Sequence, residues 1–241
     1  MIYRIACFSD THTQHLQVDM PKCDLAIFAG DSTDRGGQYQ TFDFLDWFNK
    51  QYEATHKVMI AGNHEVAWDA EKYTHNAPPD WTTGSYFELT YPNVKYLNNS
   101  SVNIWGLNIW GSPVTPNFFP EYWGFNKSRG AEIRKVWDQI PSDTDILISH
   151  GPMRGSLDWI ANGGHNMEHL YPSGNVGCDD LRDKVYSLPN LKLFVCGHIH
   201  DNTATLDIPI GSRNLKYVNA ACLTNRYQFR HQPQVVEIEI P

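Results

Sequence analysis

Eight polar residues of this chain have the types and the spacing of a metal site. They comprise two carboxylates, one amide and five imidazoles, gathered in five short clusters. Imidazole together with carboxylate suits Mn, Fe, Zn and similar divalent ions. Two of the clusters repeat a residue-x-residue spacing, which places both side chains on the same side of an extended segment. The eight residues are Asp10, His12, Asp31, Asn63, His64, His150, His198 and His200.

The size of this set indicates more than one ion. Even seven of these eight groups are too many for one tetrahedral ion, but they fit two ions that share a bridging carboxylate. Two metal ions a few ångströms apart form a clamp suited to in-line displacement at phosphorus. Each cluster alone is equally well explained by a turn or a surface histidine. What favours a site is the combination, because every cluster follows a predicted strand.

Short apolar runs and helical patterns supply the elements that must position these residues. Each run ends at one of the clusters, and open α/β sheets bind ligands at the carboxyl ends of their strands. Apolar residues at helical spacing lie between the runs, which favours a layered α/β fold. A hairpin over 102–111 and strands over 215–221 and 235–240 would add antiparallel strands or a second sheet. The runs are 3–8, 25–29, 58–61, 146–148 and 191–196, and the helices 39–52, 129–140 and from Asp179 or Asp180 to about 188.

Composition excludes several other classes of protein. Hydrophobic residues make up 41% of the 241 residues and charged residues only 19%, so an intrinsically disordered chain is excluded and one domain over residues 1–241 is expected. No apolar run reaches the length of a membrane helix, and no secretory signal is recognisable. The net charge of -8 argues against extended nucleic-acid binding. Five cysteines without a CxxC pair favour reduced thiols and a cytoplasmic location.

At these clusters the chain resembles the calcineurin-like metallophosphoesterase superfamily, whose five motif blocks occur in order between residues 10 and 200. Stretches at 111–113, 123–126, 129–130, 137–141, 157–159 and 218–220 resemble its metallophosphoesterase-domain-containing (MPPED-like) branch. The chain departs from that branch in the loop 162–177, where substrate choice is least predictable. The blocks are Asp10-x-His12, Gly30-Asp31-x-x-Asp34, Gly62-Asn63-His64-Glu65, Ser149-His150-Gly151-Pro152 and Gly197-His198-Ile199-His200.

The resemblance implies a fold and a cofactor. The fold is an α/β, four-layer α-β-β-α sandwich of two mixed sheets. The cofactor is a pair of divalent ions, with Mn²⁺ expected in vitro and Fe, Zn, Ni or Mg as alternatives. Carried over onto this sequence, one ion is held by Asp10, His12, Asp31 and His200, and the other by Asp31, Asn63, His150 and His198.

The resemblance also implies roles around the ions. His64 looks like the general acid or a positioner of the phosphate, and a hydrogen bond from Asp34 would fix its ring. Residues 30–36 also resemble a block of protein serine/threonine phosphatases in which the arginine grips phosphate. Arg35 therefore has two readings, a phosphate contact or a surface salt bridge. Asn63, His64 and Arg35 are the candidate substrate contacts.

The function expected from this set is hydrolysis of small phosphodiesters of nucleotide or cyclic-nucleotide type. A metal-bridging hydroxide would attack in line, and His64 would protonate the leaving group. The partner is then a small anionic phosphoester, without a membrane. Two alternatives stay open. One is a phosphomonoesterase or protein serine/threonine phosphatase, and the other is a non-catalytic metal- or nucleotide-binding module.

Overall fold

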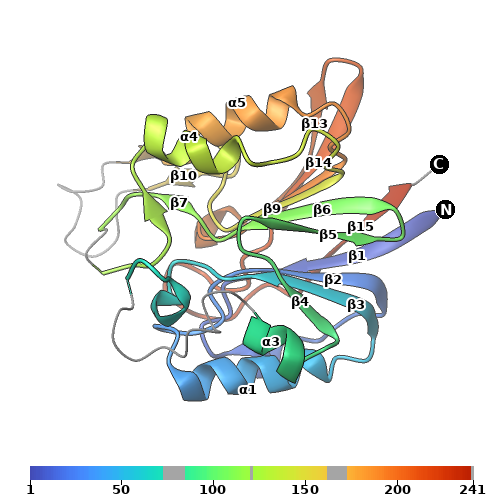
Figure 1. The fold of residues 1–241 in the computed structure, drawn as a ribbon, viewed down its shortest axis with the longest axis vertical. Helices are drawn as coiled ribbons and strands as arrows, with labels where there is room; N and C mark the ends of the chain where they lie inside the picture. The colour runs from blue at the N-terminus through green and yellow to red at the C-terminus, as the bar shows by residue number, and fades with distance from the viewer. Residues whose placement is uncertain (73–84, 120–121, 162–172, 240–241) are drawn as a thin grey trace.

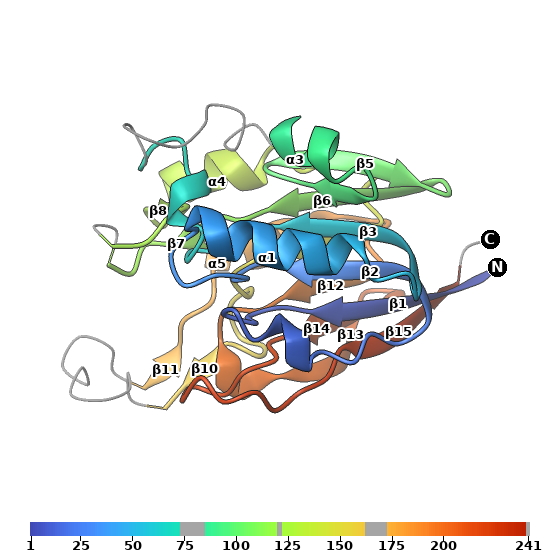
Figure 2. The ribbon, with the colours of Figure 1, turned by 90° about the horizontal axis from the view of Figure 1, so that it is seen from below.

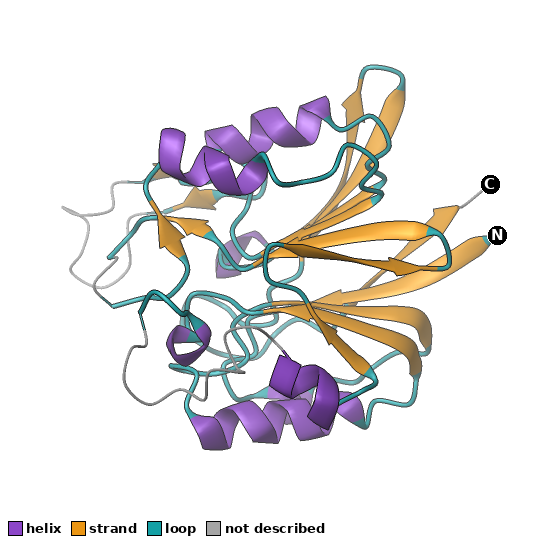
Figure 3. Cartoon of the chain, in the orientation of Figure 1, coloured by secondary structure: helices purple, strands orange, loops and turns teal. Residues whose placement is uncertain are grey.

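Two mixed β-sheets face each other in the computed structural model, and helices cover their outer faces (Figure 1). The structure describes residues 1–72, 85–119, 122–161 and 173–239. The helices α1 and α3 lie below one sheet, and α4 and α5 lie above the other (Figure 3). The expectation of a four-layer α-β-β-α sandwich of two mixed sheets is therefore confirmed.

The first sheet has the strand order β15-β1-β2-β3-β4. Strands β1 to β4 are parallel, and β15 pairs with β1 in the antiparallel sense. Three of the predicted runs and the predicted C-terminal strand are found here. The bounds are β1 Ile2–Phe8, β2 Cys23–Ala29, β3 Ala54–Ile60, β4 Val94–Tyr96 and β15 Gln234–Glu239.

The second sheet has the strand order β13-β14-β12-β9-β6-β5. Its four central strands are parallel, and both edge strands are antiparallel to their neighbours. The predicted hairpin is the pair β5 and β6, which turns at Trp105 and Gly106, both with positive φ. The bounds are β5 Ser100–Ile104, β6 Leu107–Ser112, β9 Ile146–Ser149, β12 Leu193–Cys196, β13 Ala204–Ile210 and β14 Arg213–Asn219.

The helices are shorter than the apolar spacing predicts. After Asn49 the chain tightens into i+3 hydrogen bonds, so α1 ends before the predicted residue 52. Gly130, at φ 82°, sets the start of α4, and the same tightening follows Trp137. The bounds of the helices are α1 Gln38–Asn49, α3 Ser85–Thr90, α4 Ala131–Trp137 and α5 Asp179–Ser187. The 3-10 turns are η1 His15–Gln17, η2 Val66–Trp68 and η3 His200–Asn202. The short strands are β7 Thr115–Pro116, β8 Asn126–Lys127, β10 Trp159–Ile160 and β11 Gly174–Asn175.

The cap of α5 differs from the prediction. The Cys178 Sγ, not an aspartate, accepts the hydrogen bond from the Leu181 N–H. Asp180 is drawn away from the helix start because its carboxylate accepts hydrogen bonds from Gly130 N–H and from Arg134. An ion pair with the neighbouring α4 therefore displaces the side chain that local cap preferences favour.

Alternating side chains give the sandwich its three buried layers. In β1, Ile5 and Cys7 face the second sheet, whereas Ala6 and Phe8 face α1, as the two-residue period of a strand requires. Figure 2, seen from below, shows α1 lying along the first sheet. There the ring of Phe44 packs against that of Phe28, with 4.5 Å between ring centroids and an interplanar angle of 42°. The third layer packs α4 and α5 on the second sheet through Ile133, Trp137, Leu181, Val185, Leu147 and Phe194.

Candidate metal centre

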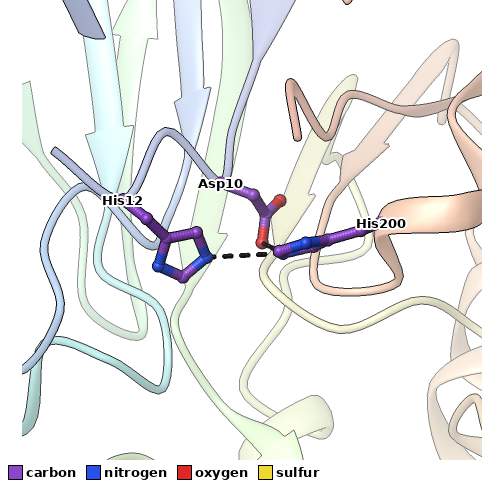
Figure 4. Close-up of side chains that lie close together, drawn as sticks. All are labelled: Asp10, His12 and His200. Atoms are coloured by element: carbon purple, nitrogen blue, oxygen red, sulfur yellow. Dashed lines mark hydrogen bonds and ion pairs between the residues drawn. The ribbon is translucent and has the colours of Figure 1, made fainter. Parts of the chain in front are cut away.

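The first group of candidate ligands lies between the ends of β1 and β12. Asp10 and His12 follow β1, and His200 follows β12; each offers a ligand atom within 4.8 Å of the others. Figure 4 shows the two imidazoles facing each other, with Nε2 of His12 3.3 Å from Nε2 of His200. The same His200 nitrogen lies 3.3 Å from Oδ1 of Asp10. Three side chains that are distant in sequence thus point at one position.

The second group adjoins the first through Asp31, which also forms a set of ligand atoms within 4.8 Å with His12 and His64. Oδ2 of Asp31 lies 3.1 Å from Nε2 of His150 and 3.8 Å from Nε2 of His12. His198 completes a second set of ligand atoms within 4.8 Å, together with Asp31 and His150. Oδ1 of Asn63 lies 3.0 Å from Nε2 of His150. All seven residues expected to hold metal are therefore brought together, with the Asp31 carboxylate between the two groups.

Strained backbone conformations aim several of these side chains. Asp10, His12, Asp31 and His198 all have positive φ, between 37° and 68°, a region that non-glycine residues rarely adopt. Each residue follows the end of a central strand, where the chain must turn sharply to bring its side chain onto the rim. Backbone strain is thus present at four of the seven candidate ligands.

Close packing requires glycine at the motif positions. Gly62 has no room for a side chain, because a Cβ atom there would lie 2.7 Å from Cε1 of His150 and would overlap the Asp31 carboxylate. Gly30 has φ 99°, and a Cβ atom there would lie 2.7 Å from Nδ1 of His150. Both glycines therefore make space for the second group.

Main-chain carbonyls fix the orientation of two rings. Nδ1 of His150 donates to the Ala29 carbonyl oxygen at 2.8 Å, and Nδ1 of His200 donates to that of Thr224 at 3.0 Å. Because a carbonyl only accepts, Nδ1 carries the hydrogen in both rings. In the neutral rings the lone pair is consequently on Nε2, which faces the cluster. Outer partners of this kind are typical of metal-binding histidines.

The two carboxylates are ionised although they are buried. Burial alone would raise the pKa of Asp10, but the hydrogen bond and positive charge of His200 lower it to about 2. Burial also opposes ionisation of Asp31, but the charges of His150 and His64 hold its pKa well below the usual range. The site therefore presents two negative charges to any cation.

The imidazoles divide into two kinds. Burial lowers the pKa of His12 to about 4 and that of His198 to about 3, so both rings are neutral at pH 7. Burial also tends to lower the pKa of His150, but the Asp31 carboxylate outweighs this effect and raises the pKa to about 9. At His200 the Asp10 carboxylate likewise raises the pKa. Each carboxylate thus favours the protonated form of one histidine beside it, His150 for Asp31 and His200 for Asp10.

The donor set fits two divalent ions. Nε2 of His12 and Nε2 of His200 face each other at 3.3 Å, and Nδ1 of His12 is buried without a hydrogen-bond partner among the described residues. A cation between the two rings would accept both Nε2 lone pairs, while Nδ1 of His12 keeps its hydrogen. The mixture of imidazole nitrogen, carboxylate and amide oxygen is the chemistry that Mn, Fe and Zn prefer.

The predicted contact between Asp34 and His64 is formed by a different atom. Nδ1 of His64 donates to the main-chain carbonyl oxygen of Asp34 at 2.8 Å, whereas the Asp34 carboxylate accepts from Nε2 of Gln40 at 2.7 Å. The expectation of a side-chain bond was therefore wrong. The physical reason is that the turn after Asp31 points the Asp34 carbonyl at the ring and its side chain into solvent, where Gln40 binds it. His64 is still held, with Nε2 left free of that bond.

Glu65 is a structural residue of the site that sequence reasoning missed. It is fully buried and accepts hydrogen bonds from the N–H groups of Asp31, Thr33 and Gly62 and from the hydroxyls of Ser32 and Thr33. Burial and the nearby Asp31 raise its pKa. One carboxylate thus ties the loop after β2 to the loop after β3. Its place in the Gly-Asn-His-Glu block was the only signal in the sequence.

Aromatic rings that sequence reasoning did not place form the wall of the site. Trp123 stacks on His64 at 4.1 Å between ring centroids, and Phe118 lies 4.9 Å from His198. Tyr227 packs edge-on to His12 and to His200, at 4.9 and 5.3 Å. These rings come from loops without a periodic pattern. Trp123 lies in a stretch that resembles the MPPED-like branch, but that resemblance did not place its ring at the site.

The surface salt bridge considered for Arg35 is not seen among the residues that the structure describes. Its guanidinium donates instead to the Tyr122 carbonyl oxygen at 2.9 Å and lies 5.4 Å above the Trp123 ring. Because Trp123 stacks on His64, Arg35 is connected to the site through that ring. Of the divergent loop 162–177, residues 162–172 lie outside the described residues. The remainder contains β11, which pairs with β10.

The site and the fold agree with what comparisons with known proteins show. A family model described as calcineurin-like phosphoesterase matches residues 3–202. The human Metallophosphoesterase domain-containing protein 1 is 34% identical over 250 residues, which cover 99% of this chain and 72% of that protein. A UPF0046 protein of Caenorhabditis elegans is 30% identical over 240 residues, covering 98% of this chain and 75% of its own length.

A solved structure shows the same fold at low sequence identity. The phosphopantetheinyl hydrolase of Mycobacterium tuberculosis superposes with a TM-score of 0.57 at 15% identity, covering 92% of this chain and 90% of that one. No described helix is long and apolar enough to cross a membrane. The matched family model and the relatives show that this chain belongs to the calcineurin-like phosphoesterases, a family of divalent-metal-binding phosphoric ester hydrolases, and to their metallophosphoesterase-domain-containing branch.

Proposed function

We propose that this protein is a phosphodiesterase that hydrolyses small anionic phosphodiesters of nucleotide or cyclic-nucleotide type at a two-metal centre. The observation that carries the proposal is the position of Asp31 between two groups of ligand atoms. One bridging carboxylate with ligands on either side is the arrangement that two-metal hydrolysis at phosphorus requires. Mn²⁺ is the expected ion in vitro, with Fe, Zn, Ni or Mg as alternatives.

The chain's own residues then have distinct tasks. Asp10, His12, Asp31 and His200 would hold one ion, and Asp31, Asn63, His150 and His198 the other. When bound, the ions supply an activated water and positive charge for the phosphate. Asn63 and His64 border the space beside both groups and would contact the phosphate. Arg35 would act through Trp123, on which its guanidinium lies.

His64 is proposed as the general acid. Its Nδ1 donates a hydrogen bond to the main-chain carbonyl oxygen of Asp34. A proton on Nε2 is therefore the one available to a leaving alkoxide. Trp123 on its face limits the ring to one orientation. Loss of such an acid typically slows turnover by about 10² to 10⁴ without removing the metal.

The test compares a diester with the matching monoester. Metal-depleted protein is supplied with Mn²⁺ and assayed on bis(4-nitrophenyl) phosphate and on 4-nitrophenyl phosphate. We expect the diester to be hydrolysed faster. Asp31→Ala and His198→Ala should lose both metal and activity, whereas His64→Ala should keep metal and lose turnover. A wild-type rate in His64→Ala would refute the acid role.

The same assay separates the remaining alternatives. Preference for the monoester would favour a phosphomonoesterase or a protein serine/threonine phosphatase. Bound metal without hydrolysis of either substrate would favour a binding module. A cytoplasmic location is also proposed, supported by five buried cysteines that are all free thiols.

A further inference from the structure

Two hollows of different size adjoin at the candidate metal centre. The smaller contains the candidate ligands Asp31, Asn63 and His200, and the larger opens beside it. The larger has a volume of about 710 Å³ and the smaller about 270 Å³. They share a wall that includes Phe118, Trp123 and His198. A phosphodiester has two ester arms, so a phosphorus atom at this shared wall can direct one arm into each hollow.

The larger hollow is lined mainly by apolar side chains. Pro116, Phe119, Pro152 and Val176 belong to its wall and not to that of the smaller hollow. Two of the polar side chains in this wall, Arg129 and Asn117, are already engaged. Arg129 donates to the carbonyls of Val176 and Gly177, and the Asn117 amide donates to Ser128 Oγ. An occupant would therefore be held by apolar contact and stacking, not by hydrogen bonds to these donors.

The smaller hollow is polar and contains the proposed acid. Asn63, His64, Asp201, Asn225 and Tyr227 line it, and none of them lines the larger hollow. Trp123 lines both hollows and stacks on the His64 ring. His64 is consequently placed to reach an oxygen on the polar side of the phosphorus.

We propose that the substrate is an asymmetric diester whose bulky apolar arm enters the larger hollow and whose small polar arm is the leaving group. The inference rests on the proposed function and deepens it. The bond between phosphorus and the oxygen of the polar arm breaks, and the electron pair stays on that oxygen, which takes a proton from His64. Water forms the new phosphorus–oxygen bond and releases a proton, and His64 is reprotonated from solvent. The products are a small polar alcohol and the phosphomonoester of the apolar alcohol.

The test uses a diester whose arms have similar intrinsic reactivity. One arm is 2-(1-naphthyl)ethyl and the other is 2-methoxyethyl, so both leaving groups are primary alcohols. We expect the products to be 2-(1-naphthyl)ethyl phosphate and 2-methoxyethanol, identified by mass spectrometry. Naphthylethanol and methoxyethyl phosphate as the main products would overturn the inference. Bis(4-nitrophenyl) phosphate is assayed in parallel, because failure to hydrolyse it would instead count against the proposed function.

A matched pair of variants separates the two hollows. Val176→Trp fills the larger hollow, with Val176→Phe as a milder replacement, and Asn225→Trp narrows the smaller one. The direct readout is the fluorescence of 2-(1-naphthyl)ethanol titrated into metal-free protein, which requires neither catalysis nor metal. Val176→Trp should weaken binding at least about 10-fold, the size of effect expected for an apolar pocket that no longer fits. Asn225→Trp should leave it unchanged.

The outcomes distinguish the proposal from its failure. Weaker binding in Val176→Trp, with a matching rise in KM for the asymmetric diester, supports the apolar-arm assignment. Equal binding of naphthylethanol by wild type and both Val176 variants, with thermal melting showing that all are folded, overturns it. Binding that is lost only in Asn225→Trp would assign the apolar arm to the smaller hollow and would also overturn it.

Discussion

Replacing Glu65 tests whether one buried carboxylate organises the metal centre. In Glu65→Gln, the oxygen can stay at the Oε2 position, where it accepts from the N–H groups of Asp31 at 2.9 Å and of Gly62 at 2.7 Å. The hydroxyls of Ser32 and Thr33 can rotate to accept from the new amide. The Thr33 N–H then faces a donor and loses its acceptor, which was 2.9 Å away.

The expected cost follows from that single unsatisfied group. A buried N–H without a partner costs about 1–3 kcal/mol. Burial and Asp31 raise the pKa of Glu65, which means that they disfavour its charged form. The neutral amide of Glu65→Gln avoids that unfavourable charge, which offsets part of the cost of the unsatisfied N–H. The lower half of the range is therefore expected for Glu65→Gln. Glu65→Ala leaves three N–H groups without an acceptor, so it should destabilise the fold at least twice as much. Metal affinity should fall as well, by about 10- to 100-fold, because Glu65 anchors the Asp31 backbone.

Urea unfolding of metal-free protein measures the stability, and titration with Mn²⁺ measures the affinity. The control is Glu71→Gln, whose carboxylate is 71% exposed and pairs with Lys127 at the surface. That change should cost less than about 1 kcal/mol. If Glu65→Gln matches wild type in both unfolding midpoint and Mn²⁺ affinity, the carboxylate does not organise the loops and the reasoning is refuted.

Three further predictions address other parts of the site. Asp34→Asn should retain wild-type turnover within about 3-fold, because the main-chain carbonyl and not the carboxylate holds His64; a loss as large as that of His64→Ala would contradict this. Uptake of Mn²⁺ at pH 7 should release protons, because Asp31 raises the pKa of His150 to about 9 and the metal must displace the proton on that ring. Calorimetry in two buffers of different ionisation enthalpy measures this proton release. Equal heats of binding in the two buffers would contradict the prediction. Burial lowers the pKa of His15, so near that pKa the folded protein binds fewer protons than the unfolded chain. The stability that neutral His15 contributes above about pH 6.5 should therefore be lost as the pH falls. The unfolding midpoints of wild type and His15→Leu should diverge below that pH.

The sequence was sufficient to predict which candidate ligands lie together, because its signal is local. Apolar runs that end in polar residues, such as the run before Asp31, reveal both a strand and its carboxyl end. The rule that ligands gather at these ends then brings distant clusters together without any knowledge of side-chain contacts. His150 and His12, which are 138 positions apart, are both brought to Asp31 in this way.

The remaining features depend on contacts that no local pattern encodes. Trp123 and Tyr227 come from loops whose course is set by the sheets around them. The N-cap of α5 is Cys178, whereas the carboxylate of Asp180 binds Arg134 of α4. Whether Asp34 meets His64 through its side chain or its carbonyl is decided by one turn of the backbone. Local sequence propensities favour one arrangement over another at such positions, but contacts with residues distant in sequence determine which arrangement forms.

The two groups of ligands join the two halves of the sandwich. Asp10 and His12 extend from the first sheet, whereas His200 extends from the second; Asp31 and His150 are divided in the same way. A bound ion would therefore link segments up to 190 positions apart in the folded protein, and it would stabilise the fold because the unfolded chain has no preformed site. Bound ions would hold the two sheets together at this rim, so the lifetime of the folded state would be coupled to the rate of metal release. Catalysis and kinetic stability would then share the same atoms.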